Sequence, residues 1–498
     1  MKKIIILVVV FFIMVSLTFA LFNQTPINVS QGGDHNCIVP RMAVDKWGNI
    51  HVVWEEYLTE SNNEIMYRKY TAQGWSEKIN ISNNSWPSRE PDVAVDEKGN
   101  AYIVWLDTFN TSGFKFSVAF REIDANGKMK EIKKILPQPG SNFRLPSIAS
   151  SPTGDLQVVS YTHNYKVYGT HRENNQWSTP HRIHRPSAKF AGESAYVVWG
   201  KNGKFYGVWP EYNPSTDDAM TVYLASREIG KNWTIPDVVN ATGDAQGHPR
   251  IIVDEDGTIH VVWMDEEGSR FDIVYEKWDP QRKKWEMPLI VSNDGDLSNL
   301  PSLTKTAAGE IYVGWVIGAW GHLKNAFYSI QDKNGNWNKS LSFLESGINN
   351  AYFTEFASGG PNDNVFFIYA ESVKTDNKKE VFLLTKKPIE VSAMLYPPKT
   401  VSVSTIETIK LNPSWKNSFN LVSWTANDEN SKNDITVVKY RIYRKGKGEN
   451  DSKFVKIGEV DANVFSYYDS TFEKGKEYDY GVSSVDKETN ESSIKIAQ

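Results

Sequence analysis

The chain has 498 residues, of which 40% are hydrophobic, 13% aromatic and 23% charged, and its formal net charge is −5. This composition is typical of a globular protein and excludes a largely disordered chain. The slightly acidic balance gives no indication of the basic surface that nucleic-acid binding requires, so we expect no nucleic-acid partner. The 17 tryptophans favour an all-β fold, in which flat side chains pack between sheets.

The N-terminus has the pattern of an export signal. Two lysines precede an apolar run from Ile4 to about Phe22, and Ala20 fits the last residue before a cleavage site. We therefore expect residues 1–20 to be a signal peptide, with an uncleaved membrane anchor as the alternative because the run is long. In both cases we expect a bacterial protein that is secreted or held at the cell surface. Cys37 is the single cysteine, which excludes an intrachain disulfide and favours a buried apolar role.

A segment of about 15 residues recurs along the chain at a spacing close to 50 residues. The clearest copies are Pro40–Trp54, Pro91–Trp105 and Pro249–Trp263; weaker copies begin at Pro146 and Pro301, and degenerate ones lie around 194–209 and 352–369. Each copy reads as a strand, an Asp-x-x-Gly turn and a second strand, and two further strands follow it. Four-stranded units at this period predict a β-propeller of seven blades, with six as the alternative.

Two recurring residue types in this unit have structural interpretations. Asp45, Asp96 and Asp254 open glycine-containing hairpins, so we interpret them as turn residues and expect no metal and no cofactor. A tryptophan recurs at the end of the second strand, and we expect this residue to pack between neighbouring blades. Its copies are Trp54, Trp105, Trp209, Trp263 and Trp315.

The ends of the repeat region predict how the ring closes. The last unit has no fourth strand after Val381–Thr385. The segment Thr25–Ser30 resembles Glu77–Ser82, the fourth strand of the first unit, and it precedes the first repeat. We therefore expect the N-terminal strand to complete the last blade of a propeller spanning residues 25–392, which leaves no open sheet edge.

The repeats resemble the sialidase-like, BNR-type propeller superfamily over about residues 25–390. Asp332–Trp337 is the nearest match to the Asp-box of that family, and the other turns are more degenerate. Phe143–Pro146 looks like the Arg-Ile-Pro motif, and the resemblance implies that Arg144 grips a carboxylate. The chain departs from the sialidase pattern in its remaining arginines and in the nucleophilic tyrosine with its glutamate partner, none of which we can match.

Residues 397–498 have a different character and resemble a fibronectin type III domain, a β-sandwich. Leu421–Trp424, Lys439–Arg444 and Lys476–Val482 alternate apolar and polar residues as strands do. The resemblance implies that Trp424 is a core residue and that Tyr478 forms the tyrosine corner. We expect this domain to act as a spacer.

Propeller geometry predicts that one rim holds the site. The loops that follow the second strand and those that lead into the first strand meet around the mouth of the central channel. Carboxylates, arginines, histidines and an aromatic residue fall in these loops, and such groups bind sugars and anions. The candidates are Glu56, Arg89, Asp107, Arg144, His163, Glu211, His248, Arg250, Asp265, Trp320 and Glu371.

Two hypotheses of function follow from this rim. The first is a binding protein that recognises a glycan or a cell-surface protein through the rim without catalysis. The second is a carbohydrate-active enzyme, either a sialidase-like glycoside hydrolase or a polysaccharide lyase, in which paired acids or a histidine beside an arginine do the chemistry. The fold alone does not choose between them.

Overall fold

The computed structural model contains two compact units, residues 1–390 and 391–498. It describes residues 22, 25–109, 115–137, 142–184, 194–212, 220–239, 245–267, 270–292, 297–318, 325–343, 351–372, 378–391, 397–409, 416–432, 435–473, 475–487 and 489–497. The expected signal peptide, residues 1–20, and Trp320 lie outside these residues. Among the helices in the described ranges, none is long and apolar enough to cross a membrane.

The described part of the N-terminal unit forms seven antiparallel sheets, here numbered in chain order. Sheet 1 contains β2 (Asn36–Val44), β3 (Ile50–Tyr57), β4 (Asn63–Thr71), β5 (Gly74–Trp75) and β6 (Ile79–Asn80). Sheet 2 contains β7 (Ser88–Val95), β8 (Ala101–Asp107), β9 (Ser117–Ile123) and β10 (Lys133–Leu136). Sheet 3 contains β11 (Phe143–Ser150), β12 (Leu156–Thr162), β13 (Val167–Glu173), β14 (Gln176–Trp177) and β15 (His181–Arg182).

Sheets 4 to 7 repeat this order. Sheet 4 contains β16 (Tyr196–Gly200), β17 (Lys204–Tyr212), β18 (Met220–Arg227) and β19 (Asp237–Val238). Sheet 5 contains β20 (Ala245–Val253), β21 (Ile259–Glu267), β22 (Arg270–Asp279), β23 (Lys284–Trp285) and β24 (Leu289–Ile290). Sheet 6 contains β25 (Ser298–Lys305), β26 (Ile311–Ile317), β27 (Asn325–Gln331) and β28 (Leu341–Ser342). Sheet 7 contains β29 (Ala351–Gly359), β30 (Asn364–Ser372), β31 (Lys379–Thr385) and, from the chain's start, β1 (Ile27–Asn28).

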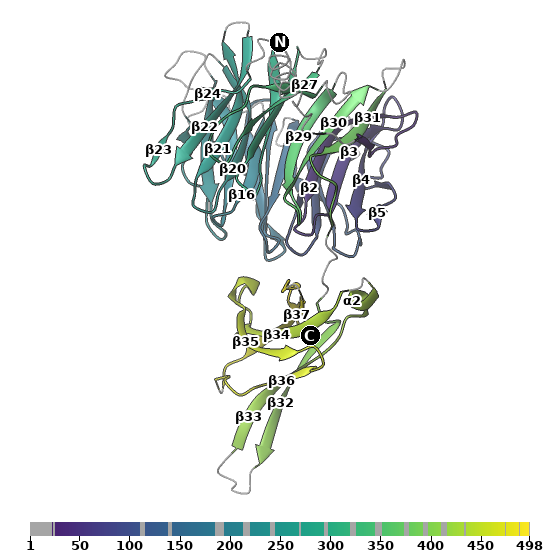
Figure 1. Ribbon diagram of the computed structural model, residues 1–498, viewed down its shortest axis with the longest axis vertical. Coiled ribbons are helices and arrows are strands. Elements are labelled where there is room, and N and C mark those ends of the chain that lie inside the picture. The colour runs from purple at the N-terminus through teal and green to yellow at the C-terminus, as the bar shows by residue number, and fades with distance from the viewer. Residues whose placement is uncertain are drawn as a thin grey trace, which may run out of the picture. The chain divides into compact units, whose positions relative to one another are not determined.

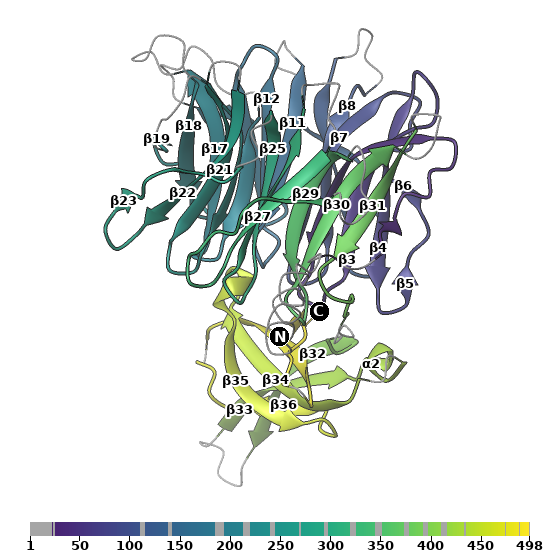
Figure 2. The same cartoon turned by 45° about the horizontal axis from the view of Figure 1, so that its top comes forward.

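The sheets form a closed, propeller-like ring. The first strand of each sheet contacts the first strand of the next, in the order β2, β7, β11, β16, β20, β25 and β29, and β29 contacts β2 again. In Figures 1 and 2, sheet 7 (green) accordingly lies beside sheet 1 (purple). The first strands therefore surround the centre of the ring.

In each of three sheets, the same pattern of hydrogen bonds attaches the last strand to the strand beside it. In sheet 7 the Glu380 carboxylate accepts hydrogen bonds from the Ser30 hydroxyl and from the Gly32 N–H (2.8 Å), while the Val381 N–H donates to Ser30 Oγ (2.9 Å). The two contacts of the serine hydroxyl recur within sheet 1 through Glu64 and Ser82 and within sheet 5 through Asp272 and Ser292. In sheet 7 alone among these three, the contact joins opposite ends of the repeat region.

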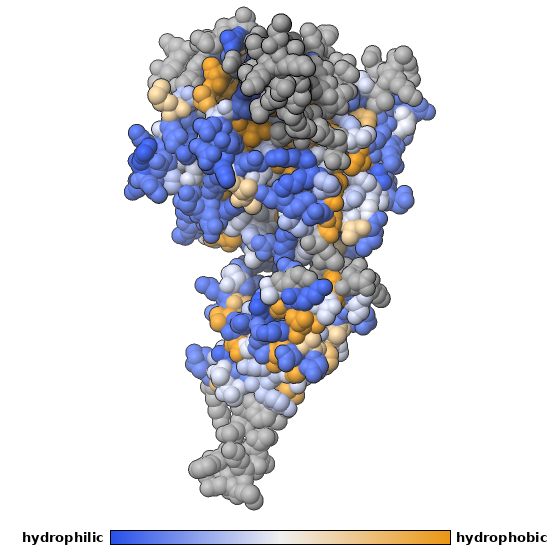
Figure 3. Space-filling model, in the orientation of Figure 1, coloured by the Kyte–Doolittle hydropathy of each residue, from blue (hydrophilic) through white to orange (hydrophobic). Residues whose placement is uncertain are grey.

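Apolar side chains fill the spaces between the sheets. The recurring Trp54, Trp105, Trp209, Trp263 and Trp315 are all fully buried. Trp54 packs with Ile368 and Leu383 of the neighbouring sheet, so the structure confirms that this residue packs between sheets. Cys37 is a free thiol buried in the same cluster. The side of the unit seen in Figure 3 is largely hydrophilic, with scattered apolar side chains.

The C-terminal unit has two facing sets of strands. One sheet contains β32 (Thr400–Ile409), β33 (Lys416–Thr425) and β36 (Ser466–Asp469), and the other β34 (Val437–Gly446), β35 (Val455–Asp461), β37 (Tyr478–Asp486) and β38 (Lys495–Ile496). A short helix, α2 (Asp428–Lys432), and a 3₁₀ turn, η2 (Asp451–Lys453), complete the described elements. Trp424 is buried in its core with Tyr440 and Tyr480.

Candidate functional site

The first strands carry a repeated backbone irregularity that shapes the centre of the ring. In six of the described sheets the pairing of the first and second strands shifts register at the same position. At each shift one residue has a φ between 41° and 52°. These residues are Val39, Glu90, Leu145, His248, Leu300 and Phe353. Five of them precede a proline, where the left-handed region is strained, and such bulges redirect side chains.

All six bulge residues line one cavity of about 460 Å³. It is also lined by residues of the flanking strands and loops, namely Ile38, Arg41, Glu55, Tyr57, Arg89, Arg144, Tyr161, His163, Tyr165, Arg250 and Thr354. Cavities of this size suit one or two sugar units or another small ligand. The bulges therefore build a site from a backbone feature that recurs in six described sheets and from side chains that differ among them.

Four arginines give this cavity its positive character. Arg41 and Arg250 occupy equivalent places in the repeat, and each donates a hydrogen bond from Nη1 to the carbonyl of the preceding proline at 3.0 Å. The Arg250 guanidinium lies over the Tyr196 ring, 4.5 Å from its centroid. Within the described part of the chain, the buried Nε atoms of Arg89 and Arg144 have no hydrogen-bond partner. The Arg144 side chain is nevertheless 36% exposed, so part of its guanidinium is accessible to a ligand with acceptor oxygens.

Two glutamates also line the cavity, and a bulge connects them. The N–H of Glu90 donates to Glu55 Oε2 at 3.2 Å, and the Asn63 side chain donates to Glu55 Oε1. Burial raises the pKa of Glu55 to about 7, so a large fraction of this carboxyl is protonated at neutral pH. Burial also raises the pKa of the neighbouring Tyr57, and the Glu55 charge adds to this effect. Glu55 is thus a proton donor or acceptor held at the cavity wall.

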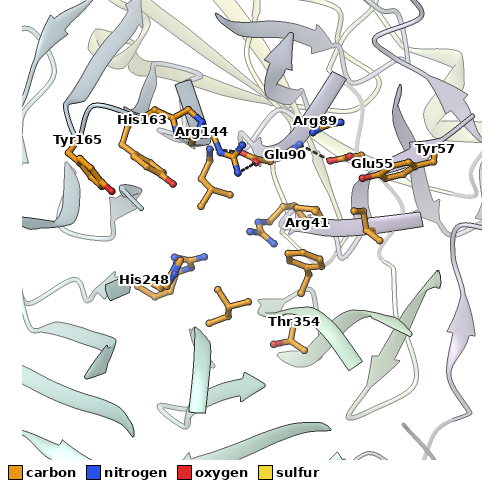
Figure 4. A pocket seen from close by; sticks show the side chains of 17 residues that line it. Arg41, Glu55, Tyr57, Arg89, Glu90, Arg144, His163, Tyr165, His248 and Thr354 are labelled. Atoms are coloured by element: carbon orange, nitrogen blue, oxygen red, sulfur yellow. Dashed lines mark hydrogen bonds and ion pairs between the residues drawn. The ribbon is translucent and has the colours of Figure 1, made fainter. Parts of the chain in front are cut away.

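The histidines lie on the other side of the mouth. Figure 4 shows His163 and Tyr165 on one side, Glu55 and Tyr57 on the opposite side, and Arg144 with Glu90 between them. His163 is exposed, whereas His248 is buried. Burial lowers the pKa of His248 to about 4, and Arg250 and Arg41 add to this effect, so its imidazole is neutral at neutral pH.

Charged groups also lie beneath the cavity. A smaller void of about 30 Å³ adjoins Asp92, Arg41, Arg250 and Tyr196. Burial raises the pKa of Asp92 and raises that of Glu355 to about 7, while Arg41 opposes both effects. Burial, followed by the charge of Arg41, lowers the pKa of Arg250. The two acids partly offset the arginine charge at the floor.

The structure brings five of the rim candidates together in the cavity: Arg89, Arg144, His163, His248 and Arg250. Four acidic candidates lie elsewhere, each accepting a hydrogen bond from the tryptophan two residues earlier in its strand. The donor–acceptor pairs are Trp54–Glu56 (3.0 Å), Trp105–Asp107 (3.1 Å), Trp209–Glu211 (2.8 Å) and Trp263–Asp265 (3.2 Å). Glu371 is likewise not among the residues that line the cavity.

Sequence reasoning missed Arg41, Glu55, Tyr57 and Tyr165. Arg41 could have been found, because Pro40–Arg41 repeats Pro249–Arg250. Glu55 could have been chosen over Glu56 by strand alternation, since a residue two positions after a buried tryptophan shares its face. No metal-binding group of three or more histidine, cysteine or acidic side chains occurs among the described residues.

Comparison with known proteins supports the fold. Residues 194–391 match the profile of a family described as "BNR repeat-containing family member". No curated protein matches the chain. Among solved structures, a polysaccharide lyase described as an ulvan lyase is 11% identical with a TM-score of 0.51, and the match covers 73% of this chain and 96% of that one.

Two further structures are similar at lower scores. A protein of unknown function from Dyadobacter fermentans is 11% identical (TM-score 0.47, covering 74% of this chain and 99% of that one). The α-L-arabinofuranosidase Arb93A from Fusarium graminearum is 13% identical (TM-score 0.43, covering 73% and 98%). At these identities the likeness concerns the fold alone. The N-terminal unit is therefore an all-β, propeller-like unit, of which residues 194–391 match a BNR-repeat family.

Proposed function

We propose that this protein is an extracellular carbohydrate-active enzyme that cleaves glycans containing uronic acids, by the elimination reaction of a polysaccharide lyase. The observation that carries the proposal is the cavity in which Arg41, Arg89, Arg144 and Arg250 surround a space beside His163 and Glu55. The similarity of the N-terminal unit to an ulvan lyase supports an enzyme over a protein that only binds.

The arginines would bind the carboxylate of the sugar. A guanidinium forms paired hydrogen bonds with a carboxylate, and Arg144, whose side chain is partly exposed, lines the cavity together with Arg89. Neutralising the carboxylate makes the proton on the adjacent carbon, C5, more acidic, since negative charge develops beside it in the transition state. Neutralisation of the carboxylate by the arginines is therefore the first requirement of the reaction.

His163 and Glu55 would then transfer the protons. The His163 imidazole takes the C5 proton, the C5–H electrons form a C4–C5 double bond, and the C4–O bond breaks. The leaving oxygen receives a proton from Glu55, whose pKa of about 7 keeps a proton available at neutral pH. The positions of the two residues on opposite sides of Arg144 support this division of roles (Figure 4).

The test is the appearance of an unsaturated product. The purified protein is incubated with alginate, polygalacturonate, glucuronan and sulfated uronic-acid polysaccharides, and the ultraviolet absorbance of the C4–C5 double bond is followed. We expect activity on at least one of them, a loss of at least about 100-fold in Arg144→Gln and His163→Gln, and none in Glu97→Gln, an exposed acid outside the cavity. Saturated products would show a glycoside hydrolase, and binding without products would show the binding protein.

We also propose the finer organisation of the chain. The seven sheets are blades of a seven-bladed propeller, which β1 closes by pairing with β31. The second unit is a fibronectin type III domain, supported by its two sheets and its buried Trp424. Residues 1–20 direct export, and the test is N-terminal sequencing of the protein recovered from culture medium.

A further inference from the structure

Glu90 has an unusual position in the cavity. It is the acidic member of the bulge ring, with a φ of 51° directly before Pro91, where a side chain of this size is strained. Its side chain reaches the bulge of the next sheet, where Oε2 accepts the Leu145 N–H at 2.7 Å and Oε1 lies 3.3 Å from Arg144 Nη2. A backbone held this way against its preferences is a common sign of function.

Through these contacts the Glu90 carboxylate pairs with Arg144, the arginine that, in the proposed function, binds the carboxylate of the substrate. Its carboxylate lies against one Nη of Arg144, which belongs to the part of the guanidinium that a ligand can reach, since Nε is buried. A bidentate pair with a ligand carboxylate requires both groups on one edge of the guanidinium, so the ligand and Glu90 compete for the same cation. A ligand carboxylate beside Arg144 would also be repelled by the Glu90 carboxylate.

We propose that Glu90 is a specificity-determining residue that competes with the acid group of the ligand for Arg144. In the free protein its carboxylate occupies Arg144, and the ligand carboxylate displaces it. An anionic ligand must displace Glu90 from Arg144 at the cost of that ion pair, whereas a neutral ligand leaves the pair in place. Glu90 thus lowers the affinity for acidic glycans and aids their release. This inference rests on the proposed anion-binding role of Arg144.

The experiment measures binding by calorimetry, with trigalacturonate as the acidic probe and its methyl ester as the neutral one. Glu90→Gln keeps an oxygen for the Leu145 N–H and removes the charge, and Glu90→Asn also removes the charge with a residue that tolerates left-handed backbone. We expect both variants to bind trigalacturonate at least about fivefold more tightly than the wild type at low salt, and to bind the ester unchanged. Glu97→Gln, which removes an exposed charge from the same sheet, should change neither affinity.

A double-mutant cycle assigns the effect to Arg144. In an Arg144→Gln background, the gain from Glu90→Gln should disappear. Weaker binding of trigalacturonate in both Glu90 variants would mean that Glu90 holds Arg144 in place, and an equal gain for the ester would mean that charge at Arg144 is not involved; either result overturns the proposal. If Arg144→Gln alone leaves the wild-type affinity intact, the proposed binding site itself is wrong. If trigalacturonate binds neither the wild type nor the Glu90 variants, the proposal for Glu90 fails, while the proposed function is decided by the assay for unsaturated products.

Discussion

Replacing Ser30 by alanine tests how the ring is held closed. The Ser30 hydroxyl is fully buried, donates to the Glu380 carboxylate and accepts the Val381 N–H at 2.9 Å. The variant removes a hydrogen bond to a charged group and leaves a buried N–H without its partner. Each of these effects costs about 1–3 kcal/mol, so we expect a loss of about 3 kcal/mol from the free energy that holds β1 on β31.

The assay is hydrogen exchange followed by mass spectrometry at neutral pH. A loss of about 3 kcal/mol corresponds to about a hundredfold faster exchange through local opening. We expect this increase at both partners of the closure, residues 27–33 and 379–385, because the contact joins segments that are 350 residues apart. Opening would also expose the edge of β31 and promote aggregation.

Ser82→Ala is the matched control, because Ser82 makes the same contacts with Glu64 and the Ile65 N–H inside sheet 1. It should cost a similar free energy but increase exchange in sheet 1 alone, since the covalent chain keeps its strand close. If β1 remains as protected in Ser30→Ala as in the wild type, the closure does not depend on this contact. If Ser82→Ala also releases β1, the effect reports general instability.

Further predictions concern pH and the buried acids. The pKa of Glu55 is raised from 4.5 to about 7 in the folded protein, so the free energy of unfolding should fall by at most about 3 kcal/mol as the pH rises between these values. Urea titrations should show that the free energy of unfolding of Glu55→Gln depends less on pH in this range. The pKa of His248 is lowered from 6.5 to about 4, so its contribution to the free energy of unfolding is lost as the pH falls through that range. His248→Gln should therefore lose less stability than the wild type on going to pH 4. If either variant keeps the wild-type dependence of stability on pH, the shift assigned to that residue is wrong. Glu56→Ala removes the acceptor of the Trp54 indole and the partner of Lys78, and should lower the free energy of unfolding by about 2–4 kcal/mol while the cleavage rate of the folded fraction is unchanged. A stable but inactive Glu56→Ala would instead place this acid in the reaction.

The fold class could be predicted from the sequence because each sheet is encoded by a recognisable sequence repeat. The copies beginning at Pro40, Pro91 and Pro249 each form a first and second strand, and their tryptophans are buried as expected. The arginines and histidines of the site could be predicted in part because they lie where the first strands begin. Arg144 and His248, for example, are separated by more than a hundred residues in sequence yet line one cavity.

The choice between neighbouring acidic residues required strand alternation in addition to their position in the repeat. Glu55 and Glu56 are adjacent, and a one-residue difference in strand register decides which of them faces the cavity. The bulges could not be predicted from the sequence either, because a residue before a proline normally avoids the left-handed backbone conformation that the bulges require. Tertiary contacts, such as that of Glu90 with the next sheet, stabilise a conformation that local sequence does not favour.

The ring of bulges determines how substitutions can alter the ligand preference of such a protein during evolution. In the six bulges the backbone fixes the direction of one side chain, while its identity varies from valine to glutamate, leucine, histidine and phenylalanine. A substitution at one of these positions therefore alters the chemistry of the cavity at a single point without requiring the sheets to rearrange. Glu90, whose side chain accepts the Leu145 N–H of the next bulge, couples two of these positions, and new ligand preferences can otherwise be reached one residue at a time.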